Sequence, residues 1–224
     1  TAEKYSNIEN IVLSGDGSIN AIGDAGNNII TGNDSANSLD GGEAIDQLIG
    51  NGGNDTLIID SLDTLVDGGE GTDWIVSSTN VVLDGDIVNN VENVLLVGSD
   101  TLSAAGSAAA NALVGNSVAN SLFGGEGADT LTGAGGFDTL TGGDGNDVFV
   151  LGNSTANNYG TSLGGTFALI TDFTVGSDKL QLKGSGASDY SVDSTNPSQV
   201  LISSVDTNIG LVAKINVVSG TAGD

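Results

Sequence analysis

The chain has 224 residues, with 29 acidic residues against four lysines, a formal net charge of −25, and neither cysteine nor histidine. Aromatic residues make up only 4% of it, so a conventional globular core is not expected and the apolar residues must be spread along a repeat. Because histidine and cysteine are absent, metalloprotease and Ser/His or Cys/His hydrolase mechanisms are excluded, and we expect no enzyme.

The negative charge is concentrated in residues 1–150, which hold 23 acids and one lysine, whereas residues 151–224 hold six acids and three lysines. Such a field repels nucleic acid and anionic membranes and attracts cations, so a divalent ion is the expected partner. No apolar run is long enough for a transmembrane helix, and no basic-then-apolar signal stands at the start. We therefore expect no nucleic-acid binding and no membrane insertion.

A nine-residue period runs along the chain. Steps of nine from Val12 to Ile75, and again from Leu95 to Phe149, meet only apolar residues. Each such position predicts one inward side chain on a short strand. Since a nine-residue unit divides into a six-residue turn and a three-residue strand, two units make one coil, and equivalent residues of every second unit are expected to stack.

Six of these units spell, fully or nearly, the pattern G-G-x-G-x-D-x-U-x, in which U is a bulky apolar residue. They are GGEAIDQLI at 41–49, GNGGNDTLI at 50–58, GGEGTDWIV at 68–76, GGEGADTLT at 124–132, GAGGFDTLT at 133–141 and GGDGNDVFV at 142–150. The sixth position of each turn is therefore an aspartate: Asp46, Asp55, Asp73, Asp129, Asp138 and Asp147.

Stacking of every second unit predicts columns of sixth-position side chains. In the first half these are Asn37, Asp55 and Asp73 on one side, with Asn28 and Asp46 opposite; in the second half they are Asn111, Asp129 and Asp147, with Asn120 and Asp138 opposite. The asparagine turns either bind a cation weakly or form a hydrogen-bonded ladder. The turn at 59–64 has lost its glycines and carries Thr64 at position six, so we expect no site there.

The repeat is itself duplicated. Residues 7–58 align with 90–141 without a gap, and 26 of the 52 pairs are identical. The offset between the copies is nine repeat units plus two further positions, so the two halves are out of phase. We expect a first module at 1–76, an inter-module segment with longer strands at 77–94, a second module at 95–150 and a C-terminal region at 151–224.

Stacked carboxylates require a counter-ion. Two carboxylates about 5 Å apart repel by about 3 kcal/mol at an effective dielectric constant near 20. Without histidine or cysteine the ligands are all oxygen atoms, which suits a hard cation, and a high-coordination, carbonyl-rich site favours Ca²⁺ over Mg²⁺. Ordering nine residues costs about 9–18 kcal/mol, while burying one leucine returns about 1.5–3 kcal/mol. We therefore expect calcium binding and folding to be one equilibrium.

These nonapeptides resemble the repeats of the RTX family of secreted bacterial proteins, in which the pattern forms a calcium-stabilised parallel β-roll. The resemblance implies an all-β solenoid that binds several Ca²⁺ ions and folds outside the cell after type I secretion. It also implies ligands from the backbone carbonyls of the first four turn positions and from the sixth-position side chain. Including the asparagine turns, the implied metal-binding residues are Gly41, Gly42, Glu43, Asp46, Gly50, Asn51, Gly52, Gly53, Asp55, Gly68, Gly69, Glu70, Gly71, Asp73, Gly124, Gly125, Glu126, Gly127, Asp129, Gly133, Ala134, Gly135, Gly136, Asp138, Gly142, Gly143, Asp144, Gly145, Asp147, Asn28, Asn37, Asn111 and Asn120.

Residues 167–182 are similar to the segment that follows the last repeat in this family, of the form I-x-D-F-x-x-G-x-D-x-I-x-L. The matching residues are Ile170, Asp172, Phe173, Gly176, Asp178, Leu180 and Leu182. By resemblance, residues 151–224 form a β cap and belong to a type I secretion signal. For Asp172 and Asp178, capping and local hydrogen bonding are favoured over a metal role.

Three functional interpretations remain. The first is a secreted calcium-binding module that forms a structural or surface part, such as an S-layer-like part, of a larger protein. The second is a calcium-dependent adhesive or self-assembling module, whose partners are cell-surface polysaccharide or other copies of the chain. Ice binding is disfavoured because the third turn positions carry no row of threonines.

Overall fold

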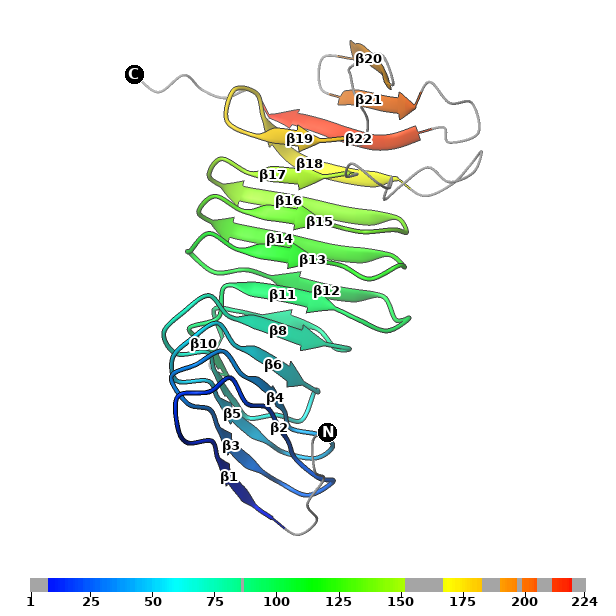
Figure 1. Cartoon of the computed structure of the whole chain (residues 1–224). Helices are drawn as coiled ribbons and strands as arrows, with labels where there is room; N and C mark the ends of the chain where they lie inside the picture. The colour runs from blue at the N-terminus through cyan, green and yellow to red at the C-terminus, as the bar shows by residue number, and fades with distance from the viewer. Residues whose placement is uncertain are drawn as a thin grey trace. The chain divides into compact units, whose positions relative to one another are not determined.

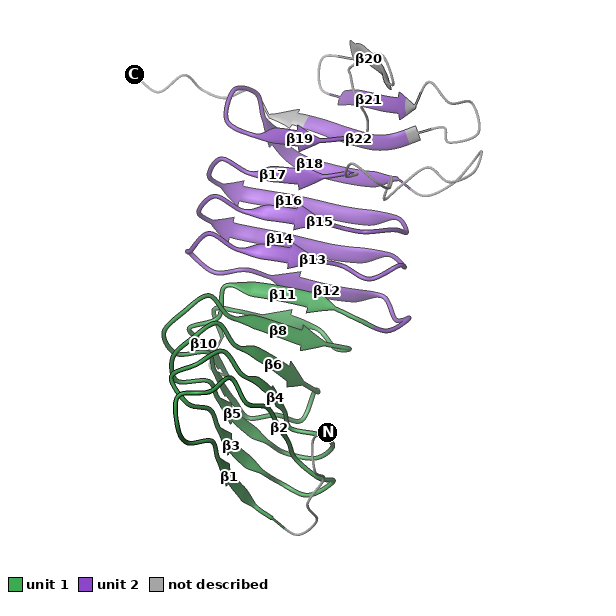
Figure 2. Cartoon of the chain, viewed as in Figure 1, with its two compact units in different colours: residues 1–97 green, residues 98–224 purple. Residues whose placement is uncertain are grey.

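A computed structural model describes residues 8–85, 87–151, 167–182, 190–196, 199–204 and 211–218. Every regular element in this part of the chain is a β-strand, and most strands pair in parallel (Figure 1). No helix among the described residues is long and apolar enough to cross a membrane. The chain divides into two compact units, residues 1–97 and 98–224 (Figure 2).

In the first unit, successive strands alternate between two parallel sheets. One sheet has the order β1 (Asn10–Val12), β3 (Ile29–Thr31), β5 (Gln47–Ile49), β7 (Leu65–Asp67) and β10 (Val88–Asn89). The other places β2 (Ala21–Ile22), β4 (Ser38–Asp40), β6 (Thr56–Ile59), β8 (Trp74–Ser77) and β11 (Asn93–Leu96) side by side. The short strand β9 (Val81–Val82) lies between β8 and β10 in the chain.

The second unit repeats this arrangement. One row of parallel strands contains β13 (Ala112–Val114), β15 (Thr130–Thr132), β17 (Val148–Val150) and β19 (Lys179–Gln181). The other begins with β12 (Leu102–Ala105), β14 (Asn120–Glu126), β16 (Asp138–Asp144) and β18 (Ala168–Thr174). It continues through β22 (Leu211–Val218), which pairs in parallel with β18, to the antiparallel strands β21 (Gln199–Ser204) and β20 (Tyr190–Asn196).

One apolar residue from each short strand points inward, and these residues stack into the core. Ile30, Leu48 and Val66 are paired from one coil to the next, as are Leu113, Leu131 and Phe149. All six are fully buried. Each buried side chain therefore contributes about 1.5–3 kcal/mol. Each sheet supplies one row of such residues, as Leu39, Leu57 and Ile75 do in the second sheet of unit 1. The parallel β-roll implied by the resemblance is the observed fold, and its coil of two nine-residue units is the one expected from the period.

The start of each predicted row is wrong. Val12 is 71% exposed, because β1 is shifted by one residue and pairs Ile11 with Ile30. Leu95 is only half-buried, because Val94 pairs with Ile75 and takes the inward place. Both rows are regular from Ala21 and Ala104 onward.

The predicted longer strands between the modules are also absent from the described residues. Segment 77–94 contains two-residue strands β9 and β10 and the beginning of β11. The coil that leads from Val66 to its partner Val88 is longer than the regular coil from Leu48 to Val66, and the coil from Ile75 to Val94 is longer by a single residue. The added residues lie in connections rather than in strands.

Candidate metal centre

The tight turns between the short strands contain residues with a positive φ. Position four of the turn has φ 147° at Gly71 and 155° at Gly145, where an added Cβ would collide with the carbonyl oxygen of position four one coil earlier. Only glycine accepts that geometry without strain. Ala44 occupies the same position with φ 84°, so turn 41–46 keeps a positive φ there although the glycine is missing.

The sixth-position side chains form the predicted columns. The backbone N–H of Asn37 donates to Asp55 Oδ1 (2.7 Å), and the N–H of Asp55 donates to Asp73 Oδ1 (2.7 Å). On the opposite edge, the N–H of Asn28 donates to Asp46 Oδ1 (2.7 Å). Each of these bonds spans 18 residues.

The second unit has the same columns. The N–H of Asn111 donates to Asp129 Oδ1 (2.7 Å), and that of Asp129 donates to Asp147 Oδ1 (3.0 Å). The N–H of Asn120 donates to Asp138 Oδ1 (2.8 Å). One oxygen of each turn aspartate is thus used to tie its turn to the coil before it.

The other carboxylate oxygen of five turn aspartates is buried and has no hydrogen-bond partner. These oxygens are Oδ2 of Asp46, Asp55, Asp73, Asp129 and Asp147, and each residue is at most 1% exposed. A buried carboxylate oxygen without a partner is strongly unfavourable. The geometry therefore calls for a positively charged group beside it.

Backbone carbonyls converge on the same places. A Cβ added to Gly50 would collide with both Asp55 Oδ2 and the carbonyl oxygen of Gly68, one coil later. At Gly124 the corresponding atoms are Asp129 Oδ2 and the carbonyl oxygen of Gly142. A carboxylate oxygen and a carbonyl oxygen from successive coils therefore share a space that only a side-chain-free residue leaves open, and this is the donor set that Ca²⁺ prefers.

Comparison with known proteins agrees with this geometry. The family model described as the RTX calcium-binding nonapeptide repeat (4 copies) matches residues 22–57, 105–140 and 123–154. The chain carries RTX calcium-binding repeats. The RTX β-roll is a structural calcium-binding fold.

Among solved structures, the chain is similar to the AlgE6R3 subunit of the Azotobacter vinelandii mannuronan C5-epimerase, studied in solution. The two are 24% identical over 54% of this chain and 73% of that chain, with a TM-score of 0.38. No curated protein sequence matches the chain.

Burial perturbs the titration of the RTX aspartates. Loss of solvation raises the pKa of Asp46, Asp73 and Asp129 to about 6, although the backbone N–H bonds to Oδ1 lower it. The same cause raises the pKa of Asp55 and Asp147. Neighbouring carboxylates add to the effect, for example Asp147 beside Asp129. The folded calcium-free chain therefore stabilises the neutral acid in positions where a bound cation stabilises the anion.

Within the described residues, no three acidic side chains gather into a metal-binding cluster. The third-position acids Glu43, Glu70, Glu126 and Asp144 are exposed on the outside of their turns. The oxygen atoms that these turns offer to a cation are therefore backbone carbonyls and one buried carboxylate per turn. On one edge, residues of the turns at 32–37, 50–55 and 68–73 line an open hollow of about 880 Å³ that includes Asp34, Asn51 and Glu70.

The asparagine turns are closed by hydrogen bonds. Asn37 Oδ1 accepts from the N–H of Asn33 four residues before it (2.9 Å), and Asn37 Nδ2 donates to the Ile19 carbonyl one coil earlier (2.7 Å). Asn28 and Asn120 bond in the same way to the coil before and to their own turn. Of the two expected alternatives, the geometry has the hydrogen-bonded ladder.

Three acidic residues that the nine-residue register did not single out complete the columns. Asp63, rather than Thr64, accepts from the N–H of Asp46 (3.1 Å), at a spacing of 17 residues. Glu92 accepts from the N–H of Asp73 (2.8 Å). Asp178 accepts from the N–H of Asp147 (3.1 Å) and of Thr174 (2.7 Å).

The segment after the last repeat bonds to the repeats as a cap. Asp172 accepts from the N–H groups of Gly142 (3.0 Å) and Gly143 (2.8 Å) through its two oxygens. Together with the bonds of Asp178, this is the hydrogen-bonding role expected for both aspartates. The last coil of RTX turns therefore meets carboxylates from the segment that follows it.

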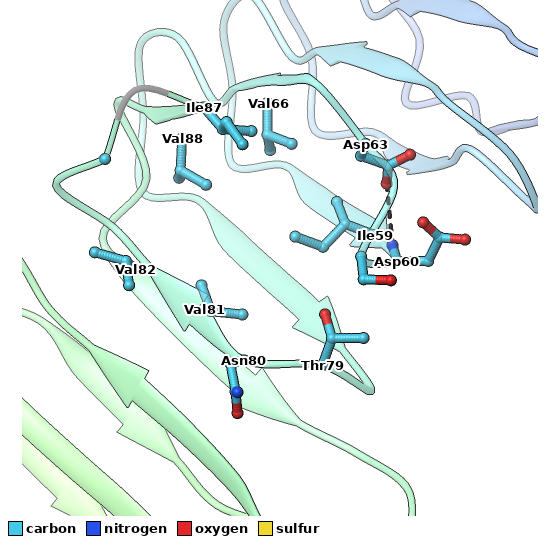
Figure 3. A pocket seen from close by; sticks show the side chains of 12 residues that line it. Ile59, Asp60, Asp63, Val66, Thr79, Asn80, Val81, Val82, Ile87 and Val88 are labelled. Atoms are coloured by element: carbon cyan, nitrogen blue, oxygen red, sulfur yellow. Dashed lines mark hydrogen bonds between the residues drawn. The ribbon is translucent and has the colours of Figure 1, made fainter.

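A separate hollow of about 510 Å³ lies where the repeat is interrupted (Figure 3). Its walls are largely apolar and include Ile59, Val66 and Val88, with Asp60 and Asp63 at one side. Both oxygens of Asp63 accept backbone hydrogen bonds, from Asp46 and from Asp60 (3.0 Å). Neither oxygen of Asp63 is therefore left without a partner, in contrast to Oδ2 of the five turn aspartates.

Proposed function

We propose that the chain is an extracellular RTX module that folds when it binds several Ca²⁺ ions after type I secretion, and that it serves as a structural or surface part of a larger protein. The observation that carries the proposal is the set of five buried, unpaired carboxylate oxygens, one in each of five turns. Each requires a cation to make its burial favourable.

Among the described residues of unit 1, no side chain supplies a cation near these oxygens. Lysine is the only positively charged side chain, and the described part of unit 1 contains none. The charge must therefore come from solution. A small, hard ion fits between turns that offer carbonyl and carboxylate oxygens, and Ca²⁺ accepts six to eight such ligands in flexible geometry.

The proposed ligands are the sixth-position aspartates, with carbonyl oxygens of the first four positions of the turns. Where an aspartate stacks on an aspartate, as Asp55 on Asp73 and Asp129 on Asp147, two carboxylates lie on one column, and we expect the strongest sites there. The hydrogen-bonded turns with Asn37 or Asn120 are expected to contribute less to calcium binding.

Coupling between binding and folding follows from the same contacts. A turn aspartate ties its coil to the preceding one through Oδ1, while its Oδ2 opposes burial until an ion is present. The ion therefore stabilises the inter-coil contact that also forms the site, and the site does not exist in the unfolded chain. Low calcium inside a cell and high calcium outside it would keep such a chain unfolded for export and fold it afterwards.

A calcium titration followed by far-UV circular dichroism and native mass spectrometry tests the proposal. We expect β-structure to appear cooperatively with Ca²⁺, in step with the uptake of several ions, and Mg²⁺ to be a poor substitute. Asp55→Asn is expected to raise the midpoint calcium concentration, whereas Asp84→Asn, at an exposed position between β9 and β10, is the matched control. Equal β content in excess chelator and in millimolar calcium would contradict the proposal.

A calcium-dependent adhesive or self-assembling role is the second candidate. It is favoured by the exposed third-position acids, such as Glu70 and Glu126, which leave carboxylates on the outer edge where calcium can bridge to polysaccharide or to another copy. Light scattering that rises with calcium, and falls for the double variant Glu70→Gln/Glu126→Gln, would support this role over that of a non-associating module.

A further inference from the structure

One of the asparagine turns near the start of each module, at 32–37 and at 115–120, contains a second asparagine, at position two, that bonds to the previous coil. Asn33, at position two of its turn, donates through Nδ2 to the carbonyl oxygens of Gly15 (2.7 Å) and Gly17 (2.9 Å). Its Oδ1 accepts from the N–H of Ser35 (3.0 Å). The side chain is 7% exposed, so these are bonds of a nearly buried amide.

The second module repeats the arrangement at the matching residue of the duplicated segment. Asn116 Nδ2 donates to the carbonyl oxygen of Asp100 (2.9 Å), and Asn116 Oδ1 accepts from the N–H of Val118 (3.1 Å). Asn116 is also 7% exposed. Asn116 thus bonds to one carbonyl of the previous coil, at position four of its turn, whereas Asn33 bonds to those of positions two and four.

Asn33 bonds to carbonyls at turn positions that, in the later turns, face a glycine of the next coil. Gly15 and Gly17 are positions two and four of their turn. In the later turns, the carbonyls of positions two and four lie directly below glycines of the next coil, as Asn51 lies below Gly69 and Gly53 below Gly71. A glycine has no side chain with which to hold these carbonyls together, whereas the amide of Asn33 does so.

The asparagine turns and the aspartate turns also differ in whether their buried polar atoms are hydrogen-bonded. Among the described residues, the buried side-chain oxygen and nitrogen atoms that lack a partner all belong to sixth-position aspartates. Asn33 and Asn37 satisfy one another, because Asn37 Nδ2 also donates to Asn33 Oδ1 (3.1 Å). At position six the asparagine turns carry a neutral side chain that is hydrogen-bonded within the roll, whereas five of the aspartate turns carry a carboxylate whose second oxygen has no partner.

We propose that Asn33 and Asn116 take the place of a calcium ion in the opening turns. The opening coils, residues 8–37 and 98–120, then fold without calcium and present a preformed edge on which the calcium-dependent coils assemble. This assignment rests on the proposed function, since it places the calcium requirement in the aspartate turns alone. It makes an asparagine that holds the carbonyls of positions two and four, and not only the residue at position six, the determinant of which turns need the ion. Asn51, also at position two, bonds instead to the position-one carbonyl of Gly32 (2.8 Å), and its turn keeps the calcium requirement.

Amide hydrogen exchange of the whole chain, measured by NMR in chelator and in calcium, tests the inference. In chelator, the amides of Ser35 and Val118, which bond to the two asparagines, are expected to exchange at least about tenfold more slowly than in an unfolded chain. The amides of Asp55 and Asp129, which bond to the next aspartate in the column, are expected to be unprotected. Calcium should protect all four.

The possible results separate the inference from the function on which it rests. Fast exchange of Ser35 and Val118 in chelator, with protection of all four amides in calcium, would overturn the inference and leave the proposed function standing. Equal protection of Asp55 and Asp129 in chelator and in calcium would overturn the proposed function and the inference together.

Two variants and a control sharpen the test. Asn33→Gly and Asn33→Asp both remove the amide donor, so protection of Ser35 in chelator should fall about tenfold or more. For Asn33→Asp, calcium should restore that protection, because a carboxylate can hold an ion where the amide held the carbonyls. Asn27→Gly replaces an exposed asparagine of the same module and should leave Ser35 unchanged. If calcium does not restore protection in Asn33→Asp, the amide is only a structural bond and the inference is wrong.

Discussion

Replacing Asp129 by asparagine should change stability in opposite directions with and without calcium. The side chain is fully buried, its Oδ2 has no partner, and desolvation raises its pKa from 3.8 to about 6. That difference in pKa means that ionising Asp129 at pH 7 costs the calcium-free fold about 3 kcal/mol. The new amide side chain would keep an oxygen for the N–H of Asn111 and remove the charge. We therefore expect Asp129→Asn to stabilise the calcium-free fold by up to about 3 kcal/mol.

The same change removes a charged ligand from the calcium-loaded fold. At a calcium concentration about 100-fold above the dissociation constant, a lost site lowers stability by about 2.7 kcal/mol. Urea unfolding followed by circular dichroism measures both effects, with trimethylamine N-oxide added in chelator to populate the folded state. Asp84→Asn, at an exposed position, should change the stability neither in chelator nor in calcium. Equal destabilisation by Asp129→Asn in chelator and in calcium would refute the reasoning.

Three further predictions concern the turns and the core. Gly50→Ala places a Cβ against Asp55 Oδ2 and the Gly68 carbonyl, so it should raise the midpoint calcium concentration about tenfold or more. Gly17→Ala, whose Cβ meets nothing within 4 Å, should leave the midpoint unchanged. Equal midpoints for the two variants would contradict a calcium site between Asp55 Oδ2 and the Gly68 carbonyl. Because burial raises the pKa of the turn aspartates, the folded calcium-free chain binds more protons than the unfolded chain between about pH 4 and 6. Its stability should therefore be highest below about pH 4 and fall as the pH rises to about 6, whereas calcium affinity should rise over the same range. Parallel pH series in chelator and in calcium measure the two effects. Leu131→Ala, at a fully buried core position, should cost about 2–5 kcal/mol in calcium by urea unfolding. A cost below about 1 kcal/mol would mean that the stacked inward residues are not the main apolar contribution.

The periodic part of the fold could be predicted because one geometric rule repeats. A nine-residue unit with one apolar strand residue fixes which side chains point inward, and the pairing of two units into one coil fixes which turns stack. The fully buried row from Ile30 to Ile75 and the columns headed by Asn37 and Asn111 follow from those two features.

The ends of the rows and columns could not be predicted, because the period fails there. Val12 and Leu95 keep the period in sequence, yet the strands around them shift by one residue to pair with the next coil. Asp63 stands one residue before the expected place, and only the loss of glycines in turn 59–64 signalled that the register changes. Glu92 and Asp178 lie in segments without glycine-turn nonapeptides, where the nine-residue spacing carries no information about stacking.

The asparagines at position two illustrate a different limit. Asn33 and Asn116 are matched by the internal duplication, which marked them as a shared landmark. Their bonds to carbonyls of the previous coil depend on which turn lies beneath, and that turn belongs to the irregular start of each roll. Local spacing alone could not separate a buried, carbonyl-binding amide from a surface asparagine.

The columns give the roll a direction. Each aspartate completes the coil that precedes it, since the bond runs from the backbone of one coil to a side chain of the next. The backbone N–H at position six of each coil therefore needs an acceptor from the next coil. At the last aspartates, Asp73 and Asp147, that acceptor comes from outside the repeat and is supplied by Glu92 and Asp178. A chain cut after a whole coil would leave a row of N–H donors able to receive the first acceptor of another chain. Shortening from the C-terminal side should consequently convert a self-contained roll into one that grows end to end.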